Sequence, residues 1–299
     1  MILFIQQNNK IDVTYLVMWK PAEARGETIV QTLTNIVILL ASTYILILVF
    51  LFFVQEKLIF PGFEPAHLNY QHRQSTTITL KVGEHKTTHL TGWRESAAAT
   101  NSDQILLYFS GNAEDNIHVI PFLSSLQVSR IYTFHYRGYG LSEGNISESN
   151  LYSDSLEIFD LIQRDNPNAT VIVMGRSLGS AIAGYVAKHR EVSKLVLLTP
   201  LHSISKIVKE SFIGLVPPFV LKHKLQLAET AKDISAPTLA VIAGKDTIIP
   251  NHHSMKSYQN LQSPKTLLTL TNAGHNDLFE FPELAEKINT FIDQGINDQ

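Results

Sequence analysis

A serine, an aspartate and a histidine occur in this chain in an order that could perform acyl transfer. Ser177 is the centre of Gly175-Arg176-Ser177-Leu178-Gly179, a G-x-S-x-G motif that directly follows the apolar stretch Thr170 to Met174. Between a buried strand and a helix, this motif forms a sharp turn that exposes the serine hydroxyl at the edge of a sheet. The N-terminus of the helix behind it adds partial positive charge near a developing oxyanion. We therefore expect Ser177 to be a nucleophile rather than a serine that merely turns the chain.

Candidates for the base and the acid that a serine nucleophile requires follow later in the chain. The base takes the hydroxyl proton, and the acid orients the base and stabilises its charged form. Asp246 follows the strand-like stretch Thr238 to Ile242, and His275 follows one that ends at Leu270. We predict that Asp246 is the acid and His275 the base. Asp277 is the alternative acid, but it is two residues from His275 and is better explained as the cap of the following helical turn.

The negative charge that forms on a substrate carbonyl during acyl transfer needs two backbone N–H donors. One comes from the residue after the nucleophile, here Leu178, and the other from the loop after an earlier strand. Ser110-Gly111-Asn112-Ala113 occupies that loop, and its glycine lets the backbone approach a substrate closely. We predict an oxyanion hole made by the N–H groups of Asn112 and Leu178, with Ala113 as the alternative to Asn112 and a plain turn as the other interpretation of this loop.

Composition narrows the classes of protein that this chain could be. The net charge of −3 and the lack of lysine and arginine runs argue against a nucleic-acid-binding protein. There is no cysteine, which excludes disulfides, thiolate metal sites and a cysteine nucleophile. We expect neither a metal nor a cofactor. With 44% apolar and 17% charged residues, the 299-residue chain has the composition of a globular protein.

A long apolar stretch near the N-terminus predicts a single membrane span. Thr28 to Gln55 contains no charged residue, and its apolar side chains surround the whole helix instead of forming one stripe. About 20 helical residues cross a hydrocarbon layer of about 30 Å. We divide the chain into an N-terminal segment (1–30), an anchor (31–55) and a catalytic domain (56–299). Three basic residues precede the span, against Lys57 alone close behind it, which places the N-terminus in the cytoplasm and the catalytic domain on the opposite side.

Strand-like and helix-like stretches alternate after the anchor. Eight strands are expected at 76–80, 87–91, 104–109, 130–135, 170–174, 194–198, 238–242 and 266–270, and four helices at 116–125, 151–163, 178–189 and 283–293. The alternation predicts an α/β fold, with a mostly parallel sheet covered by helices on both faces. The first two strands lack an intervening helix, so we expect an antiparallel edge pair. His252 and His253 follow a Pro250-Asn251 turn, and we expect both at the surface.

The interval between residues 200 and 236 is short and predicts a small apolar lid instead of a separate cap domain. We expect a helix from Ile204 to Leu215, a break at Pro217-Pro218, and a second helix from Phe219 to Leu227. Such a lid suits an acyl chain that is presented near a bilayer.

These motifs together resemble the α/β-hydrolase superfamily and, within it, single-pass membrane-anchored serine hydrolases related to lysophospholipid lipases and protein depalmitoylases. The resemblance covers roughly Leu58 to Ile292. It also rests on Lys57-Leu58-Ile59-Phe60-Pro61 and on Tyr136 to Gly144, which is similar to the family's glycine-rich Y-R-G-Y-G-x-S-x-G loop near the active site. The chain has Ser110 and His135 where the family commonly has His and Asp.

The resemblance implies an α/β-hydrolase fold and hydrolysis of carboxylic esters or thioesters through an acyl-enzyme on Ser177. The expected substrate is a small or lipid-like acyl compound, and the expected association is with a membrane through the N-terminal helix. A peptidase or amidase on the same fold is one alternative. A hydrolase of small soluble esters and a non-catalytic protein that binds a ligand or partner are the others.

Overall fold

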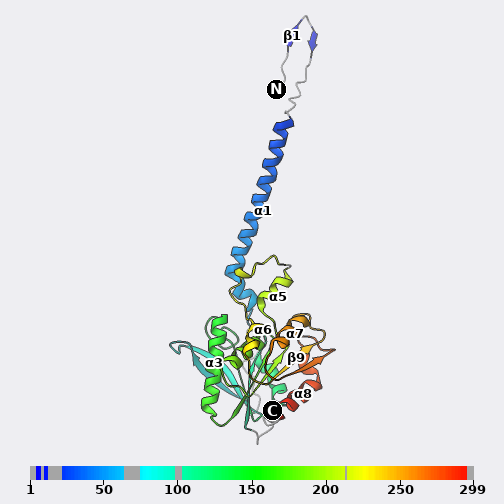
Figure 1. Ribbon diagram of the computed structural model, residues 1–299. Coiled ribbons are helices and arrows are strands. Elements are labelled where there is room, and N and C mark those ends of the chain that lie inside the picture. The colour runs from blue at the N-terminus through cyan, green and yellow to red at the C-terminus, as the bar shows by residue number, and fades with distance from the viewer. Residues whose placement is uncertain are drawn as a thin grey trace. The chain divides into compact units, whose positions relative to one another are not determined.

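The computed structural model describes residues 5–7, 10–12, 22–63, 75–97, 103–212 and 214–294. The chain divides into two compact units, Met1–Leu51 and Phe52–Gln299. In the first unit, β1 (Ile5–Gln7) and β2 (Lys10–Asp12) form an antiparallel pair. Much of the predicted N-terminal segment lies outside the described residues. Helix α1 (Ala22–Ile59) begins in the first unit and ends in the second (Figure 1).

Helix α1 is long and apolar enough, by length and composition, to cross a bilayer over Gly26–Ile59. Its 34 residues reach about 51 Å at about 1.5 Å per residue, more than a hydrocarbon core requires. The hydroxyls of Thr32, Thr34 and Thr43 donate to backbone carbonyls one turn earlier, at 2.8–2.9 Å. These polar groups therefore have partners within the helix, as a hydrocarbon environment demands.

The second unit is built on one eight-stranded sheet in the order β10-β9-β8-β7-β5-β6-β4-β3. The six strands from β10 to β6 pair in parallel, whereas β4 and β3 are antiparallel at the edge, which confirms the predicted mostly parallel sheet and its antiparallel edge pair. The strands are β3 (Ser75–Val82), β4 (Thr88–Ser96), β5 (Gln104–Phe109), β6 (Arg130–Phe134), β7 (Thr170–Arg176), β8 (Lys194–Leu198), β9 (Thr238–Ala243) and β10 (Lys265–Leu270).

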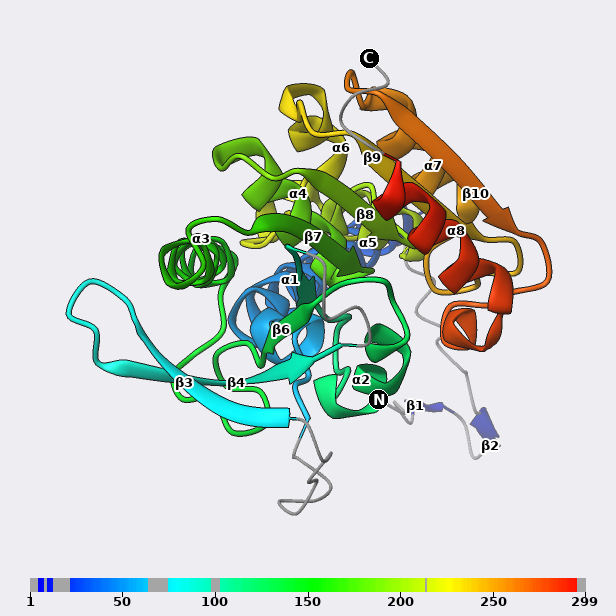
Figure 2. The same ribbon diagram turned by 90° about the horizontal axis from the view of Figure 1, so that it is seen from below.

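Helices cover both faces of this sheet, as the continuous apolar strands predict (Figure 2). In β5, Ile105, Leu107 and Phe109 belong to one core cluster, while Leu106 and Tyr108 belong to the other. The first core is closed by α3 (Glu148–Asp165), α4 (Leu178–His189), α6 (Leu227–Thr230) and α7 (Asn251–Asn260), and the second by α2 (Asn116–Ser124) and α8 (Pro282–Asp293).

The structure corrects the predictions for the lid and for the residues after Pro250. In the lid, α5 (Ile204–Ser211) ends before Leu215, and the predicted second helix is replaced by a 3-10 turn at Pro218–Val220 and the short helix α6, with no helix over residues 221–226. The residues after Pro250 form the unpredicted helix α7, and His253 on it is buried, whereas His252 is exposed as predicted. A helix packed on the sheet turns one of two adjacent side chains inward.

Candidate active site

Ser177 occupies the turn between the central strand β7 and helix α4. Its backbone has φ +52° and ψ −114°, a conformation that a non-glycine residue adopts only when its surroundings enforce it. The flanking glycines explain how the turn closes. A Cβ on Gly175 would overlap the carbonyl oxygen of Gly179, and a Cβ on Gly179 would overlap that of Phe109. Helix α4 can therefore begin directly behind the serine and against the neighbouring strand.

Asp246 and His275 meet beyond the ends of β9 and β10. The Nδ1 atom of His275 lies 2.7 Å from Oδ2 of Asp246, and the two side chains are 9% and 1% exposed. The other carboxylate oxygen of Asp246 accepts the N–H groups of Ile248 and Ile249 at 2.9 and 2.8 Å. These two bonds fix the carboxylate, and the carboxylate leaves Nε2 of the histidine as the ring atom that can face a substrate.

The hydroxyl of Ser177 makes no hydrogen bond with the His275 ring within the part of the chain that is described. Bonds between a nucleophile and its base are often long without a substrate and tighten when one binds. The residue next to the serine nevertheless connects the two loops, since Nη2 of Arg176 donates to the His275 carbonyl oxygen at 2.7 Å and to Asn276 Oδ1 at 2.9 Å.

Asp277 does not cap the following turn, which corrects the expectation for this residue. It precedes the 3-10 turn Leu278–Glu280, yet its side chain accepts no hydrogen bond from that turn. Oδ1 instead accepts the N–H of Gly274 at 2.6 Å. Asp277 therefore stabilises the backbone of the loop that contains His275, whereas Asp246 contacts the His275 ring itself.

The predicted oxyanion loop follows β5 and lies beside the elbow. Leu178 is the first residue of α4, so its N–H has no partner within the helix. Among the described residues, the N–H groups of Asn112 and Ala113 have no backbone or side-chain acceptor, whereas the N–H of Gly111 donates to Glu114. Ala113 has φ +56°, so this loop, like the turn at Ser177, contains a residue with a strained backbone. Either the N–H of Asn112 or that of Ala113 is therefore available as the donor that this loop would give to an oxyanion.

The glycine-rich loop after β6 is hydrogen-bonded to the predicted oxyanion loop. The Tyr136 hydroxyl donates to the Ser110 carbonyl oxygen at 2.7 Å, and the Tyr139 hydroxyl donates to Asn112 Oδ1 at 2.6 Å. Burial raises the pKa of both tyrosines, so both remain protonated donors. Arg137 forms a bidentate pair with Asp154 on α3, with both N–O distances 2.7 Å, which fixes the loop to that helix.

An ion pair that the sequence did not predict joins three loops around Ser177. Nη1 of Arg176 lies 3.1 Å from Glu114 Oε1, with side chains 9% and 12% exposed. Glu114 also accepts the N–H of Gly111 and the hydroxyl of Tyr108. Arg176 therefore links the histidine loop to the oxyanion loop through Glu114. Position x of the G-x-S-x-G motif is unconstrained, so the sequence carries no signal for this pair.

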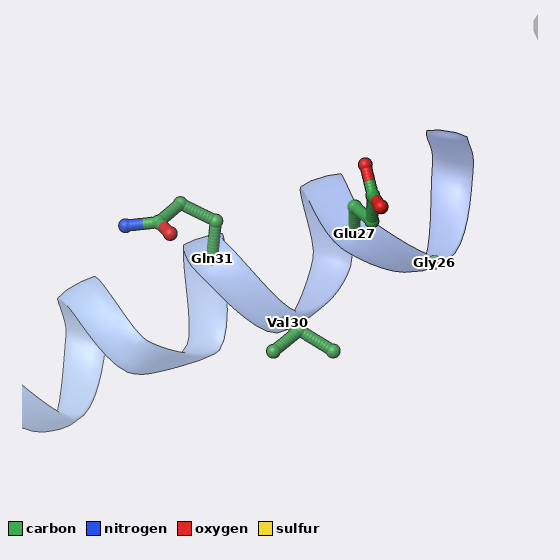
Figure 3. Close-up of a pocket in the computed structure, with 4 residues that line it drawn as sticks. All are labelled: Gly26, Glu27, Val30 and Gln31. Carbon is green, nitrogen blue, oxygen red and sulfur yellow. The ribbon is translucent and has the colours of Figure 1, made fainter. Parts of the chain in front are cut away.

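Two other features have some of the properties of a site. Glu210 on α5 lies 2.8 Å from His252 Nε2 and 3.2 Å from His253 Nε2, a group that could hold a metal ion, and its contact with His252 is an ordinary hydrogen bond. Figure 3 shows an open hollow lined by Gly26, Glu27, Val30 and Gln31. These four residues belong to consecutive turns of one helix, so the hollow encloses no space between elements.

Comparison with known proteins gives one family model and several relatives that match part of this chain. Residues 100–225 match a family model described as "Serine aminopeptidase, S33". The chain is 29% identical over 198 residues to the α/β hydrolase domain-containing protein aho-3 of Caenorhabditis elegans, covering 64% of this chain and 58% of that protein. It is 31% identical over 195 residues to the rat lysophosphatidylserine lipase ABHD12, covering 58% and 48%. The matched part is therefore less than two thirds of either relative.

Solved structures match over a larger share of the chain. The esterase Pf2001 of Pyrococcus furiosus superposes with a TM-score of 0.62 at 18% identity, over 77% of this chain and 97% of the esterase. At this identity the likeness concerns the fold alone.

Proposed function

The chain belongs to the α/β-hydrolase superfamily, and from this premise we propose that it is a membrane-anchored serine hydrolase that cleaves carboxylic esters or thioesters. The observation that carries the proposal is the buried bond between His275 Nδ1 and Asp246 Oδ2, together with the strained backbone of Ser177 at the end of β7. A carboxylate that fixes one ring nitrogen of a histidine beside a serine elbow is the arrangement that acyl transfer requires.

In the proposed reaction, Nε2 of His275 takes the Ser177 hydroxyl proton while Oγ attacks the substrate carbonyl carbon. The N–H groups of Leu178 and Asn112 stabilise the resulting oxyanion. The tetrahedral intermediate collapses, the acyl–oxygen or acyl–sulfur bond breaks, and the histidine gives its proton to the leaving alcohol or thiol. Water then repeats the sequence on the acyl-enzyme, releasing the acid and restoring the serine. Asp246 stabilises the imidazolium in both halves.

The length and composition of α1 support the membrane anchor, and the anchor supports a lipid-like substrate. The helix is continuous with the catalytic unit, because α1 ends at Ile59 inside that unit. In the proposed arrangement the anchor therefore tethers the catalytic unit to the bilayer, where acyl substrates are available. The charges flanking the helix favour a cytoplasmic N-terminus with the catalytic unit on the opposite side.

Peptide hydrolysis is the second candidate, because the matching family model is described as a serine aminopeptidase. It uses the same acyl-enzyme and differs only in its amine leaving group, so the residues above do not separate the two.

The decisive experiment labels the full chain with a fluorophosphonate probe and assays p-nitrophenyl esters of increasing acyl length beside peptide p-nitroanilides. We expect Ser177-dependent labelling, ester hydrolysis that increases with chain length, and loss of both in S177A. A folded wild-type chain that neither labels nor turns over any substrate would refute the hydrolase. A short-chain optimum would refute the lipid-like substrate, and a preference for the anilides would establish the peptidase.

A further inference from the structure

The last turns of α1 are fastened to the lid. Gln55 is 3% exposed, and its side-chain amide donates to the Val220 carbonyl oxygen at 3.1 Å and accepts the N–H of Lys222 at 2.7 Å. These two bonds pair the glutamine with the backbone as a neighbouring strand would. Lys222 Nζ lies 4.6 Å from the centre of the Phe52 ring, a cation–π contact.

A second set of contacts holds the base of the lid. His223 is 5% exposed, and its ring packs edge-on against Phe60 with centroids 5.2 Å apart. The carboxylate of Glu148 on α3 accepts the N–H groups of Lys224 and Leu225 at 2.6 and 3.0 Å. The segment from Val220 to Leu225 therefore has a fixed position relative to the end of α1.

The lid also carries large apolar side chains that are exposed, in the residues before the segment Val220 to Leu225. Phe212, Leu215 and Phe219 are 56%, 65% and 82% exposed. Water-exposed aromatic side chains grouped on one short segment mark an interaction site more often than scattered surface residues do. Lys206 and Lys209 lie on α5 just before Phe212. The segment thus combines apolar side chains with nearby cations, as segments at a membrane interface do.

The apolar end of α1, to which the lid is bonded, indicates what the exposed apolar side chains of the lid contact. Phe53 and Leu58, on the same turns of α1 as Gln55, are 73% and 64% exposed. These turns are the end of the apolar stretch Gly26–Ile59. Gln55 is the last residue of the predicted anchor, 31–55, so in the proposed arrangement a lid bonded to it lies near the membrane surface, since one helical turn rises only about 5.4 Å.

We propose that Phe212, Leu215 and Phe219 form a second membrane-contacting surface, which inserts into the lipid headgroup region beside the anchor, with Lys206 and Lys209 facing anionic headgroups. The inference rests on the anchor in the proposed function and extends it to the lid. The lid is the part of the enzyme that touches the membrane from which the substrate comes, and Gln55 is the residue that sets its depth relative to the span.

The chain contains no cysteine, so single cysteines can report membrane depth without removing any native residue of that type. The test places the full chain in nanodiscs of phosphatidylcholine and phosphatidylserine that contain doxyl-labelled lipids. A nitrobenzoxadiazole fluorophore is attached at F219C or, as a control, at E286C. Glu286 lies on α8, near the end of the catalytic unit opposite α5 (Figure 1).

We expect several-fold stronger quenching at position 219 than at position 286, and weaker quenching at 219 when Q55L is added. Equal quenching at 219 and 286 would overturn the proposal. A label at position 219 that is shielded from water in detergent but is not quenched by the doxyl-labelled lipids would also overturn the proposal, because a second copy of the chain, and not lipid, would then cover the surface.

The readout is independent of catalysis. The same quenching is expected in S177A, and a chain that is quenched at position 219 but fails to react with fluorophosphonate would refute the hydrolase while leaving the surface intact. A chain that reacts but is not quenched would refute the surface alone. A chain that does not co-purify with nanodiscs would refute the anchor and the surface together.

Discussion

Replacing Asp246 with Asn tests whether this carboxylate, and not that of Asp277, is the acid of the site. In the native arrangement Oδ2 accepts the Nδ1–H of His275 at 2.7 Å, while Oδ1 accepts two backbone N–H groups. An asparagine keeps its size and can keep those two backbone bonds through its oxygen. Its amide then points at His275 as a donor, so Nδ1 must become the acceptor and the proton moves to Nε2. The ring can no longer take the proton of Ser177.

The expected loss is large because both the tautomer and the charge are wrong. Removing the charge of a triad aspartate while keeping its shape typically costs about 10⁴-fold in rate, equivalent to about 5.5 kcal/mol of transition-state stabilisation at about 1.4 kcal/mol per tenfold. We expect kcat for a p-nitrophenyl ester to fall by about this factor in D246N, with a thermal midpoint close to that of the wild type because the backbone bonds remain.

The matched control is D277N. Asp277 accepts one N–H, from Gly274 at 2.6 Å, and an asparagine oxygen can accept it equally. We expect less than about a tenfold change in kcat, since the His275 ring keeps its partner. Wild-type-like activity in D246N would refute the assignment, and an equal or larger loss in D277N would transfer the acid role to that residue.

Three further perturbations test the surroundings of the site. G179A places a Cβ against the carbonyl oxygen of Phe109 at the end of β5, so we expect it to lower the free energy of unfolding by about 1–3 kcal/mol in denaturant titrations. The control is G26A, whose added Cβ has no atom within 4 Å and should not lower the free energy of unfolding. R176L leaves Glu114 as a largely buried carboxylate without its cation, so we expect the free energy of unfolding to fall by about 3–5 kcal/mol. Adding E114Q should recover part of this loss, because the bonds of Arg176 to His275 and Asn276 stay broken; equal losses in the single and double variants would exclude coupling between the two residues. Burial lowers the pKa of His253 in the folded chain, so the unfolded chain binds a proton at this residue more readily. The free energy of unfolding should therefore fall as the pH drops below about 6.5, the ordinary pKa of histidine. H253N should flatten the dependence of the urea midpoint on pH between about pH 7 and 5, and an unchanged dependence would refute this role of His253.

The sheet could be predicted from the sequence because its strands are buried on both faces. In a chain of alternating elements, a continuous apolar run as short as Ile105 to Phe109 is typical of a strand covered by helices on both sides, and β5 spans the predicted residues. Helix α7 could not be found in this way. Its inward residues His253, Ser254 and Ser257 are polar or small, so the helix has no apolar stripe, although it is packed against the core.

The candidate site was predictable to the extent that it depends on chain order. Ser177, Asp246 and His275 each follow a strand, and parallel strands bring their carboxyl ends to one edge. The pair of Arg176 with Glu114 depends instead on two side chains 62 positions apart, whose types are common on any surface. Only the folded chain shows that both are buried and that they connect the loops on either side of the serine.

The motif Lys57-Leu58-Ile59-Phe60-Pro61 makes contacts with two other parts of the chain that could not be predicted from its sequence. The Asn112 side chain donates to the Ile59 carbonyl oxygen at 2.7 Å, in the loop proposed to hold the oxyanion, while Phe60 is buried against His223 at the base of the lid. The last residues of α1 therefore contact both the loop after β5 and the lid. A displacement of this end of the helix by even one turn would change the surroundings of Asn112 and of the lid together.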